Sequence, residues 1–475
     1  MSTKPFLVNG QWRTGDGSFE VHNPVNGDVV AEIGKPTPID IEDAIAASAA
    51  AFEESRLLPV WARADALDLI SRRLAERRDE IAQVIALEGG KPIKWATVEA
   101  TRASSTFRIA AETIRAGDDE IMRLDTEQSL GSRVGIIRRF PYGPVLGITP
   151  FNFPVNLVAH KVAPAIAAGA PIVIKPASAT PLGSLLLAEL FMETDLPKGM
   201  FQVVTVGGAQ AEEMARDSRF AKISFTGSPA VGWHLRGVDP KKRVTLELGG
   251  NAGVIVHSDA DLDHAAARIA FGGYYQAGQS CISVQRILVQ AEVYDDFCER
   301  LVKQVEQLKT GDTLDPATDV GPVIDAGSLD RIDTWVQEAV AGGARLLIGG
   351  RREDPFYLPT VLADTKAEDK VRCEEVFGPV TTVMPYGTFD EAIAEVNDSK
   401  YGLQAGVFTR DIDRAFQAHR DLQVGGVIIN DQSAFRADQQ PYGGSKDSGV
   451  GREGLRYAIE EMTDPRIMVL SNIPL

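Results

Sequence analysis

Short apolar runs alternate with longer amphipathic stretches through most of this chain after residue 140. The runs at 145–148, 172–174 and 201–204 are almost wholly apolar, and helical patterns at 156–168 and 181–192 lie between them. Strands that are apolar on both faces are typical of parallel sheets covered by helices on both sides. The pattern therefore predicts an α/β fold with a doubly wound parallel sheet.

A second series of the same kind begins near residue 252, and the stretch 350–360 is expected to be loop. Its predicted strands are 252–256, 380–384, 406–408 and 426–429, and its predicted helices are 262–275, 294–308, 389–396 and 412–422. The chain is thus expected to form two parallel-sheet domains. Ligands of such sheets bind at the carboxyl ends of the strands.

The first 117 residues and the last few follow other patterns. Residues 1–30 read as short strands and turns, and residues 39–117 read as scaffold helices that pack on a sheet formed later in the chain. Asp40 is expected to cap the first of these helices. The tail at 467–470 reads as a strand without an evident partner, so a sheet edge or another subunit is expected to pair with it.

Composition narrows the classes of protein that fit. The chain has 475 residues, with 44% hydrophobic and 24% charged residues, and its net charge is −17. This length predicts two or three domains, and the acidic balance argues against nucleic acid or an anionic membrane as the main partner. The N-terminus has no apolar signal segment, and the longest apolar run, 162–174, is too short to span a bilayer. A cytoplasmic protein is expected.

Cysteine usage points to one residue. The three cysteines, Cys281, Cys298 and Cys373, are few and far apart, so we expect neither a disulfide framework nor a metal site. Cys281 follows a glycine-rich approach that includes Gly278. Small residues let backbone come close to a reacting group, and a nucleophilic thiolate needs such access. A buried, inert cysteine is the alternative for this residue taken alone.

Polar side chains follow the predicted strands. Asn152 stands in the rigid loop 149–154, which has two prolines, and an amide there could donate to a developing oxyanion or could satisfy loop backbone. Lys175 follows the 172–174 strand and could hold a ribose hydroxyl or a phosphate, or could be a solvated surface lysine. The turn 226–228 leads into a helix N-terminus, a feature that binds phosphates.

Two carboxylates and one glycine motif complete the candidates. Glu247 lies inside an apolar run, where burial raises a carboxyl pKa toward the range that suits a general base. Glu375 lies in an acidic loop before a strand and could accept ribose hydroxyls. The GxGxxG match at 449–454 has no preceding strand and no βαβ unit around it, so we interpret it as unrelated to dinucleotide binding.

Taken together, these motifs resemble those of the aldehyde dehydrogenase superfamily, in the family's order and over essentially the whole chain. The spacing of 34 residues from Glu247 to Cys281 also matches. The resemblance implies that Cys281 is the nucleophile, that Asn152 and the Cys281 backbone N–H form an oxyanion hole, and that Glu247 is the general base. Lys161 and Glu453 match family positions proposed for proton relay.

The resemblance also implies a cofactor site for NAD or NADP. Lys175 and Glu375 would hold the adenosine and nicotinamide riboses, Ser228 the pyrophosphate, and Phe377 would pack beside the nicotinamide. The remaining expected cofactor-binding residues are Thr149, Pro150, Phe151, Ser178, Gly208, Gly227 and Gly249. Family members that prefer NAD commonly carry Glu where this chain has Ser178, so we expect NADP to be accepted.

By the same resemblance, an aldehyde is oxidised to a carboxylic acid through a thiohemiacetal and a thioester. Glu247 favours hydrolysis, because this acid is typically replaced in the branch that forms acyl-coenzyme A. The alternatives are a CoA-acylating semialdehyde dehydrogenase and a catalytically idle protein on the same fold. Arg436 could pair with an acid group of a small hydroxy-, phospho- or semialdehyde, or could be a rim or interface residue.

The domain organisation follows from the same family. It implies a Rossmann-like cofactor domain at 1–119 and 140–248, and a catalytic domain at 249–430. Residues 120–139 and 455–475 would form a small β oligomerisation domain, and 431–454 a substrate-anchoring loop that returns to the cofactor domain. A protruding hairpin and a tail strand predict a homodimer or homotetramer.

Overall fold

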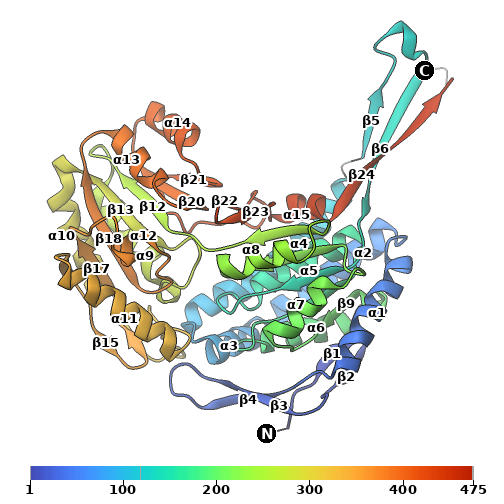
Figure 1. The fold of residues 1–475 in the computed structure, drawn as a ribbon, viewed down its shortest axis with the longest axis horizontal. Helices are drawn as coiled ribbons and strands as arrows, with labels where there is room; N and C mark the ends of the chain where they lie inside the picture. Colours follow the sequence, from blue (N-terminus) through green and yellow to red (C-terminus); the bar gives the residue numbers. More distant parts are fainter. Residues whose placement is uncertain (1, 118, 473–475) are drawn as a thin grey trace.

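The computed structural model describes residues 2–117 and 119–472, so residues 1, 118 and 473–475 of the predicted segments lie outside it. Two large sheets lie in separate halves of the molecule, and a narrow three-stranded arm projects from the half that contains the first sheet (Figure 1). Both large sheets are mainly parallel and carry helices, as the pattern of apolar runs predicted. No helix in the described part of the chain is long and apolar enough to cross a membrane.

The first sheet has eight strands in the order β2-β1-β9-β8-β7-β10-β11-β23. Its strands are β1 (Phe6–Val8), β2 (Gln11–Arg13), β7 (Val145–Ile148), β8 (Ile172–Lys175), β9 (Phe201–Val203), β10 (Lys222–Thr226), β11 (Arg243–Glu247) and β23 (Gly449–Val450). The five central strands, β9 to β11 in this order, are parallel. The motif at 449–454 begins in β23, which pairs antiparallel with β11, and a short strand, β22 (Ser445–Lys446), precedes it, contrary to the expectation that no strand does. It is therefore no part of a βαβ unit, as predicted.

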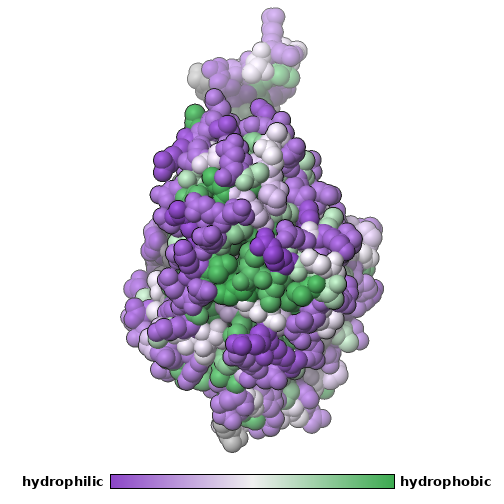
Figure 2. All heavy atoms as spheres, turned by 90° about the vertical axis from the view of Figure 1, so that its left-hand side faces the viewer, coloured by the Kyte–Doolittle hydropathy of each residue, from purple (hydrophilic) through white to green (hydrophobic). Residues whose placement is uncertain are grey.

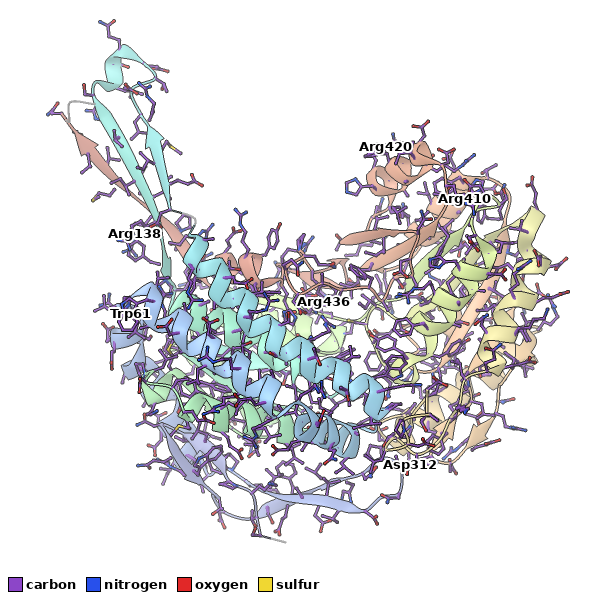
Figure 3. The ribbon with its side chains drawn as sticks, turned by 180° about the vertical axis from the view of Figure 1, so that it is seen from behind. Trp61, Arg138, Asp312, Arg410, Arg420 and Arg436 are labelled. Atoms are coloured by element: carbon purple, nitrogen blue, oxygen red, sulfur yellow. The ribbon has the colours of Figure 1, made fainter. Side chains whose placement is uncertain are left out.

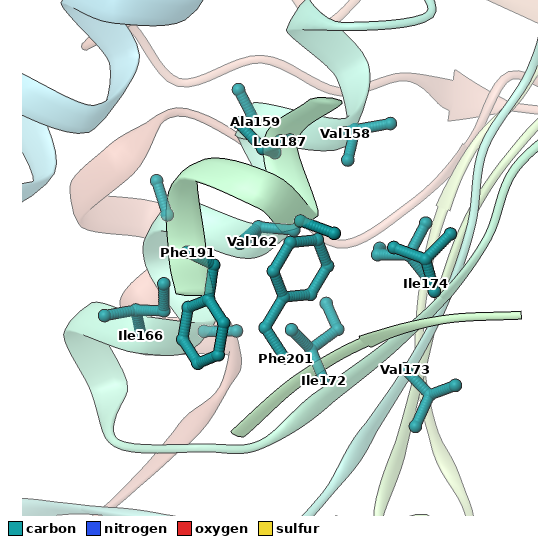
Figure 4. Packing of buried hydrophobic residues seen from close by; sticks show 14 of the residues in the cluster. Val158, Ala159, Val162, Ile166, Ile172, Val173, Ile174, Leu187, Phe191 and Phe201 are labelled. Atoms are coloured by element: carbon teal, nitrogen blue, oxygen red, sulfur yellow. The ribbon is translucent and has the colours of Figure 1, made fainter. Parts of the chain in front are cut away.

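Helices of the first half pack apolar side chains into one core, and α5 is buried along its whole length. They are α1 (Pro38–Ser55), α2 (Val60–Glu76), α3 (Arg78–Gly89), α4 (Ile93–Ala116), α5 (Asn156–Ala168), α6 (Leu182–Met192), α7 (Gly208–Arg216), α8 (Pro229–Val238) and α15 (Leu455–Glu461). Val162 and Ile166 of α5 lie near Ile172 of β8, and the rings of Phe191 and Phe201 meet edge to face at 5.5 Å (Figure 4). This packing sets the ends of β7, β8 and β10 in fixed positions.

One helix start differs from the prediction. Helix α1 begins at Pro38, and its N-cap is Thr37, whose side-chain oxygen accepts from the Asp40 backbone N–H. The Asp40 carboxylate accepts from the Thr37 N–H in return, at 2.9 Å. The expectation that Asp40 itself caps the helix was wrong: the N-cap lies three residues earlier, at Thr37, with Pro at the first helical position.

The second sheet has seven strands in the order β14-β17-β18-β13-β12-β20-β21. They are β12 (Ala252–Val256), β13 (Val284–Gln290), β14 (Arg345–Ile348), β17 (Thr360–Ala363), β18 (Val380–Tyr386), β20 (Gln404–Phe408) and β21 (Gly426–Ile429). The helices of this half are α9 (Leu262–Tyr274), α10 (Tyr294–Glu306), α11 (Ala326–Ala341), α12 (Lys370–Cys373), α13 (Phe389–Asn397) and α14 (Ile412–Asp421). The face of the molecule on this side is mostly hydrophilic, with a hydrophobic patch near its centre (Figure 2).

The sequence patterns missed several elements of this half. Strands β13, β14 and β17 and helix α11 were not predicted, and the expected loop at 350–360 contains the hairpin β15 (Arg352–Glu353) and β16 (Phe356–Tyr357). In β13, Gln285, Arg286 and Gln290 interrupt the apolar run. The first two are buried and hydrogen bond to neighbouring backbone, which a hydrophobicity pattern cannot indicate.

The arm consists of β5 (Glu120–Arg123), β6 (Arg133–Pro141) and β24 (Thr463–Ser471), with β6 in the centre. Strand β24 pairs antiparallel with β6 over nine residues. The tail strand therefore pairs with a sheet edge within this chain, one of the two kinds of partner expected for it. The predicted bridging segment 455–475 begins with α15, which packs against α4 and α5, so only β24 joins the arm.

Candidate active site

A cavity of about 750 Å³ is lined by residues from both halves of the molecule. Four strands of the first sheet, β7, β8, β10 and β11, end at its wall with Ile148, Lys175, Thr226 and Glu247. The second half contributes the loop with Cys281, the acidic loop with Glu375 and residues 434–442. Every site residue predicted from the sequence lines this cavity except Lys161.

The loop that carries Cys281 has an unusual backbone. Gln276 and Ala277 adopt positive φ angles of 57° and 52°, and Gly278 follows with φ 68°. A Cβ atom at Gly278 would lie 2.1 Å from the carbonyl oxygen of Gly378, so no side chain fits there. Strain of this kind persists only where the surroundings over-determine it, which is common at functional sites.

Cys281 has one side-chain partner in the described part of the chain. Its Sγ lies 3.0 Å from the hydroxyl oxygen of Tyr442. Burial raises the pKa of the Cys281 thiol to about 12, although the hydrogen bond with Tyr442 acts to lower it; the charges of Glu375 and Glu247 raise it further. The Cys281 backbone N–H donates no hydrogen bond within residues 2–117 and 119–472.

Asn152 lies opposite this loop and is held by it. Its side-chain Nδ2 donates to the backbone carbonyl oxygen of Gln279 at 2.9 Å. The backbone carbonyl oxygen of Asn152 accepts from Gln276 Nε2 at 2.5 Å. An amide nitrogen carries two N–H groups, so one remains available toward the cavity. Together with the Cys281 N–H, it gives two unused donors on residues that line the cavity.

Two buried carboxyl groups that line the cavity, Glu247 and Glu453, differ in protonation state. Both oxygens of Glu247 are buried without a hydrogen-bond partner. Burial and then the charge of Glu453 raise the Glu247 pKa well above its ordinary value. Burial also acts on Glu453, but the charges of Lys161 and Arg436 outweigh it and lower the Glu453 pKa to about 2. Glu453 is thus an anion, and Glu247 is held neutral beside it.

Lys161 lies below the cavity wall, in α5. Its Nζ donates to Thr226 Oγ1 at 2.8 Å, to Ser224 Oγ at 3.0 Å and to Glu453 Oε1 at 3.1 Å. These three acceptors use all the donors of an ammonium group. Lys161 therefore reaches the cavity only through Glu453 and Thr226.

Arg436 is interior and not on the rim. Figure 3 shows it between the two halves of the molecule, and only 7% of its side chain is exposed. Its Nη2 donates to Glu453 Oε2 at 3.0 Å, its guanidinium lies 3.8 Å from the centre of the Tyr442 ring, and its Nε has no partner among the described residues. An unpaired buried donor at a cavity wall is a natural contact for an anionic ligand.

A second arginine lines the same part of the cavity. Arg102 of α4 donates from Nη2 to Asp438 Oδ1 at 2.8 Å, and His160 Nε2 lies 3.2 Å from the same oxygen. Burial and the charge of Arg436 lower the His160 pKa to about 4, so His160 is neutral near pH 7. We call the lining formed by Arg102, Arg436 and Tyr442 the Arg102 region.

The remaining predicted cofactor-binding residues form another part of the cavity lining, and few of them are charged. It comprises Thr149, Pro150, Phe151, Lys175, Ser178, Gly208, Gly227, Ser228, Gly249, Glu375 and Phe377, and we call it the Lys175 region. The Lys175 ammonium makes no hydrogen bond or ion pair with any described residue, and burial lowers its pKa. Ser228 is the N-cap of α8, and its side chain makes no capping hydrogen bond. The hydroxyl is therefore available to a ligand.

Glycine shapes the rest of this region. A Cβ atom at Gly249 would lie 2.4 Å from Glu375 Oε2, and one at Gly227 would lie 2.6 Å from the Phe225 ring. Glu375 Oε1 accepts from the Gly250 N–H at 2.8 Å, and burial raises the Glu375 pKa to about 7. An unpaired cation, a free helix-cap hydroxyl and a carboxyl held against glycine suit an extended ligand that has phosphates and hydroxyls.

Sequence reasoning missed four residues of the site. Tyr442 lies within the predicted substrate-anchoring loop 431–454, but nothing marked its hydroxyl as close to Cys281. Arg102 lies on a helix that read as scaffold, and His160 and Asp438 had no distinguishing pattern. All four depend on contacts between segments far apart in the chain, so spacing alone had no signal for them.

Comparison with known proteins gives one family. The model described as "Aldehyde dehydrogenase family" matches residues 12–468. A 3-sulfolactaldehyde dehydrogenase of Priestia aryabhattai is 43% identical over 98% of this chain and 97% of its own.

Solved structures agree with this match. Aldehyde dehydrogenase 21 from Physcomitrella patens, in complex with the reaction product succinate, superposes with a TM-score of 0.97 at 42% identity, covering 100% of this chain and 99% of its own. A glyceraldehyde-3-phosphate dehydrogenase from Methanocaldococcus jannaschii, complexed with NADP, has a TM-score of 0.92 at 37% identity, covering 96% of this chain and 99% of its own.

Proposed function

Since this chain belongs to the aldehyde dehydrogenase family and is an NAD(P)-dependent enzyme, we propose that it oxidises a small acid-bearing aldehyde to the carboxylic acid. The observation that carries the chemistry is the convergence of Cys281, Asn152 and Glu247 on one cavity. A nucleophile, a pair of free N–H donors and an unpartnered carboxyl are the three groups that acyl transfer to water requires.

In this proposal the Cys281 sulfur attacks the aldehyde carbon, and the oxygen of the thiohemiacetal accepts from Asn152 and from the Cys281 N–H. Loss of a hydride leaves a thioester on Cys281. Glu247 then takes a proton from water, which attacks the thioester carbon; the acid departs and the sulfur is freed. Because Glu247 has no other partner in the described chain, its oxygens are available for that water.

The Lys175 region fits the nicotinamide cofactor. When bound, the cofactor supplies the hydride acceptor. Lys175 would contact its adenosine ribose, Ser228 its pyrophosphate and Glu375 its second ribose. Ser178 is exposed beside Lys175 and adds no negative charge, so a 2′-phosphate is not repelled and NADP is accepted alongside NAD. The NADP complex of the Methanocaldococcus relative supports this proposal.

The charges around the Arg102 region favour an acid group on the substrate. Among the described residues joined in ion pairs to Asp438 and Glu453, the three cations Arg102, Arg436 and Lys161 outnumber these two carboxylates, while the shifted pKa values leave Glu247 and His160 neutral. One positive charge is left over in a buried setting, which a carboxylate, sulfonate or phosphate would balance. The sulfolactaldehyde, succinate and glyceraldehyde-3-phosphate in the names of the three relatives all bear such a group.

We further propose the domain division expected above and a homodimer or homotetramer joined through the arm. Ile121, Met122, Ile467, Met468 and Val469 on the arm are exposed, and β5 and β24 are its two open edges. A lone arm with open edges and apolar side chains needs a partner. Light scattering of the full chain tests the assembly. We expect the mass of a dimer or tetramer for wild type and a smaller mass for Met468→Lys, which places a charge on the apolar side of the arm.

The experiment for the reaction compares matched aldehydes. Reduction of NAD and of NADP is followed with 4-oxobutanoate and with butanal, with and without coenzyme A, and Cys281→Ala is the blank. We expect turnover without a thiol and kcat/KM at least ~10-fold higher for 4-oxobutanoate. Turnover only with coenzyme A contradicts the hydrolytic role of Glu247, and equal rates for the two aldehydes contradict the acid-bearing substrate.

A further inference from the structure

Tyr442 touches the reacting atom. Its side chain is 3% exposed, and its hydroxyl oxygen, 3.0 Å from Cys281 Sγ, is the only hydrogen-bond partner of that sulfur among the described residues. The contact joins two segments that are 161 residues apart in the chain. The reaction proposed above gives this hydroxyl no role.

The ring of Tyr442 is held from three directions. Its backbone N–H donates to the Glu453 carbonyl at 3.0 Å, and the Glu453 N–H donates back to the Tyr442 carbonyl at 2.6 Å. The Arg436 guanidinium covers one face of the ring at 3.8 Å. Ile282 and Leu403 pack with Tyr442 in a small apolar cluster that Cys281 adjoins. The hydroxyl is thus fixed at the sulfur, which is what preorganised donation requires.

Resting on the proposed role of Cys281 as nucleophile, we propose that Tyr442 is a further catalytic residue. Its hydroxyl donates a hydrogen bond to the Cys281 sulfur, stabilises the thiolate and holds it toward the aldehyde carbon. A hydrogen bond from a neutral donor to an ionised acceptor is about twice as strong as one between neutral groups, so the contact favours the thiolate over the thiol.

The charged groups around the sulfur make this hydrogen bond necessary. Glu375 and Glu247 face Cys281, and any negative charge on either disfavours a thiolate, whereas Arg436 favours it. Tyr442 is the remaining group that acts to lower the Cys281 pKa, against the effect of burial. Burial raises the pKa of Tyr442 itself well above its ordinary value, so its hydroxyl keeps its proton and stays a donor.

The test reads the sulfur directly. Full-length wild type and Tyr442→Phe are alkylated with iodoacetamide across pH, and modification of the Cys281 peptide is followed by mass spectrometry. We expect Tyr442→Phe to alkylate ~10-fold more slowly at neutral pH and its profile to move to higher pH. Its kcat/KM should fall by ~10-fold or more, with KM for the acid-bearing aldehyde little changed.

Tyr386→Phe is the matched control. Tyr386 is buried, its hydroxyl donates to the Val256 carbonyl, and it does not line the cavity, so this variant also loses one buried hydroxyl contact, but away from Cys281. It should alkylate like wild type. If Tyr442→Phe folds poorly, 3-fluorotyrosine at residue 442, a stronger donor, should move the alkylation profile to lower pH.

An unchanged alkylation profile in Tyr442→Phe or with 3-fluorotyrosine overturns the proposal and leaves Tyr442 as a packing residue. A wild type that alkylates at Cys281 but oxidises no aldehyde contradicts the proposed function instead. The two profiles then still decide the role of Tyr442, because iodoacetamide reports the sulfur without the reaction.

Discussion

In the Arg102 region of the cavity, Arg102 is paired with Asp438 and Arg436 with Glu453, whereas in the Lys175 region the Lys175 ammonium has no partner in the described chain. Glu375 in the latter accepts one backbone hydrogen bond and otherwise rests against glycine. The same cavity thus contains one region whose charges are already arranged and one whose polar groups lack partners.

The difference agrees with the roles proposed above for the two regions. Charges buried next to the reacting atoms must be held by the fold, because a misplaced charge there costs transition-state stabilisation. Polar groups that bind a large, highly charged cofactor can instead obtain their partners from the ligand, provided that small residues leave it room. Substitutions in the Arg102 region should therefore alter substrate choice, and those in the Lys175 region cofactor choice.

The largest effect is expected where the two regions meet. Cys281→Ala should lower kcat/KM by ~10³-fold or more with every aldehyde and both cofactors, because no covalent intermediate can form. Steady-state reduction of the cofactor measures it, and Cys373→Ala, at an exposed site, should retain wild-type activity. Substantial activity in Cys281→Ala would place the nucleophile elsewhere.

Glu247→Gln should lower kcat by ~10²–10⁴-fold, because the water that attacks the thioester loses its base. A rapid burst of about one reduced cofactor per subunit should remain in stopped-flow measurements, since hydride loss precedes hydrolysis. A variant that loses the burst as well as turnover would assign Glu247 to an earlier step.

The dependence of kcat on pH is a further test of Glu247 as the general base. Glu247 acts as a base only when ionised, and burial raises its pKa well above the ordinary value. The wild-type kcat should therefore rise as the pH passes upward through this raised pKa, and Glu247→Gln should lack that rise. Persistence of the rise in Glu247→Gln would assign it to another group.

Arg102→Gln tests the arranged charges. KM for an acid-bearing aldehyde should rise by ~10–100-fold, because a charge-assisted hydrogen bond is lost, while KM for the neutral isostere should change by less than about twofold. Arg108→Gln is the control, on the same helix but exposed and paired with Glu112. Equal losses for both aldehydes would mean that Arg102 has a structural role only.

Ser178→Glu tests the Lys175 region and should have the smallest effect. A carboxylate beside Lys175 should raise KM for NADP by ~10-fold through repulsion of the 2′-phosphate and leave KM for NAD within about twofold. Ser178→Ala adds no charge and should change neither value strongly. If NADP and NAD respond alike to Ser178→Glu, the adenosine ribose does not lie beside Lys175.

Some features were readable from local sequence because local sequence determines them. The fully apolar strands predicted parallel sheets, and the polar residues that end β7, β8 and β11 or follow them predicted the site at their carboxyl ends. Local pattern failed where buried polar residues interrupt a strand, as in β13, and where the start of a helix depends on a proline, as in α1. In both, hydrogen bonds decide the structure, and hydrophobicity does not report them.

The sequence by itself determined the family and the two-sheet architecture, and its ordered motifs predicted Cys281, Asn152, Lys175, Glu247 and Glu375 as candidate site residues, which line one cavity. Only the tertiary structure brought the Tyr442 hydroxyl to the Cys281 sulfur and made Arg436 and Glu453 an interior pair. It also separated the protonation states of Glu247 and Glu453. The physical reason is that pKa values and hydrogen bonds depend on distance and burial between segments that the chain places far apart.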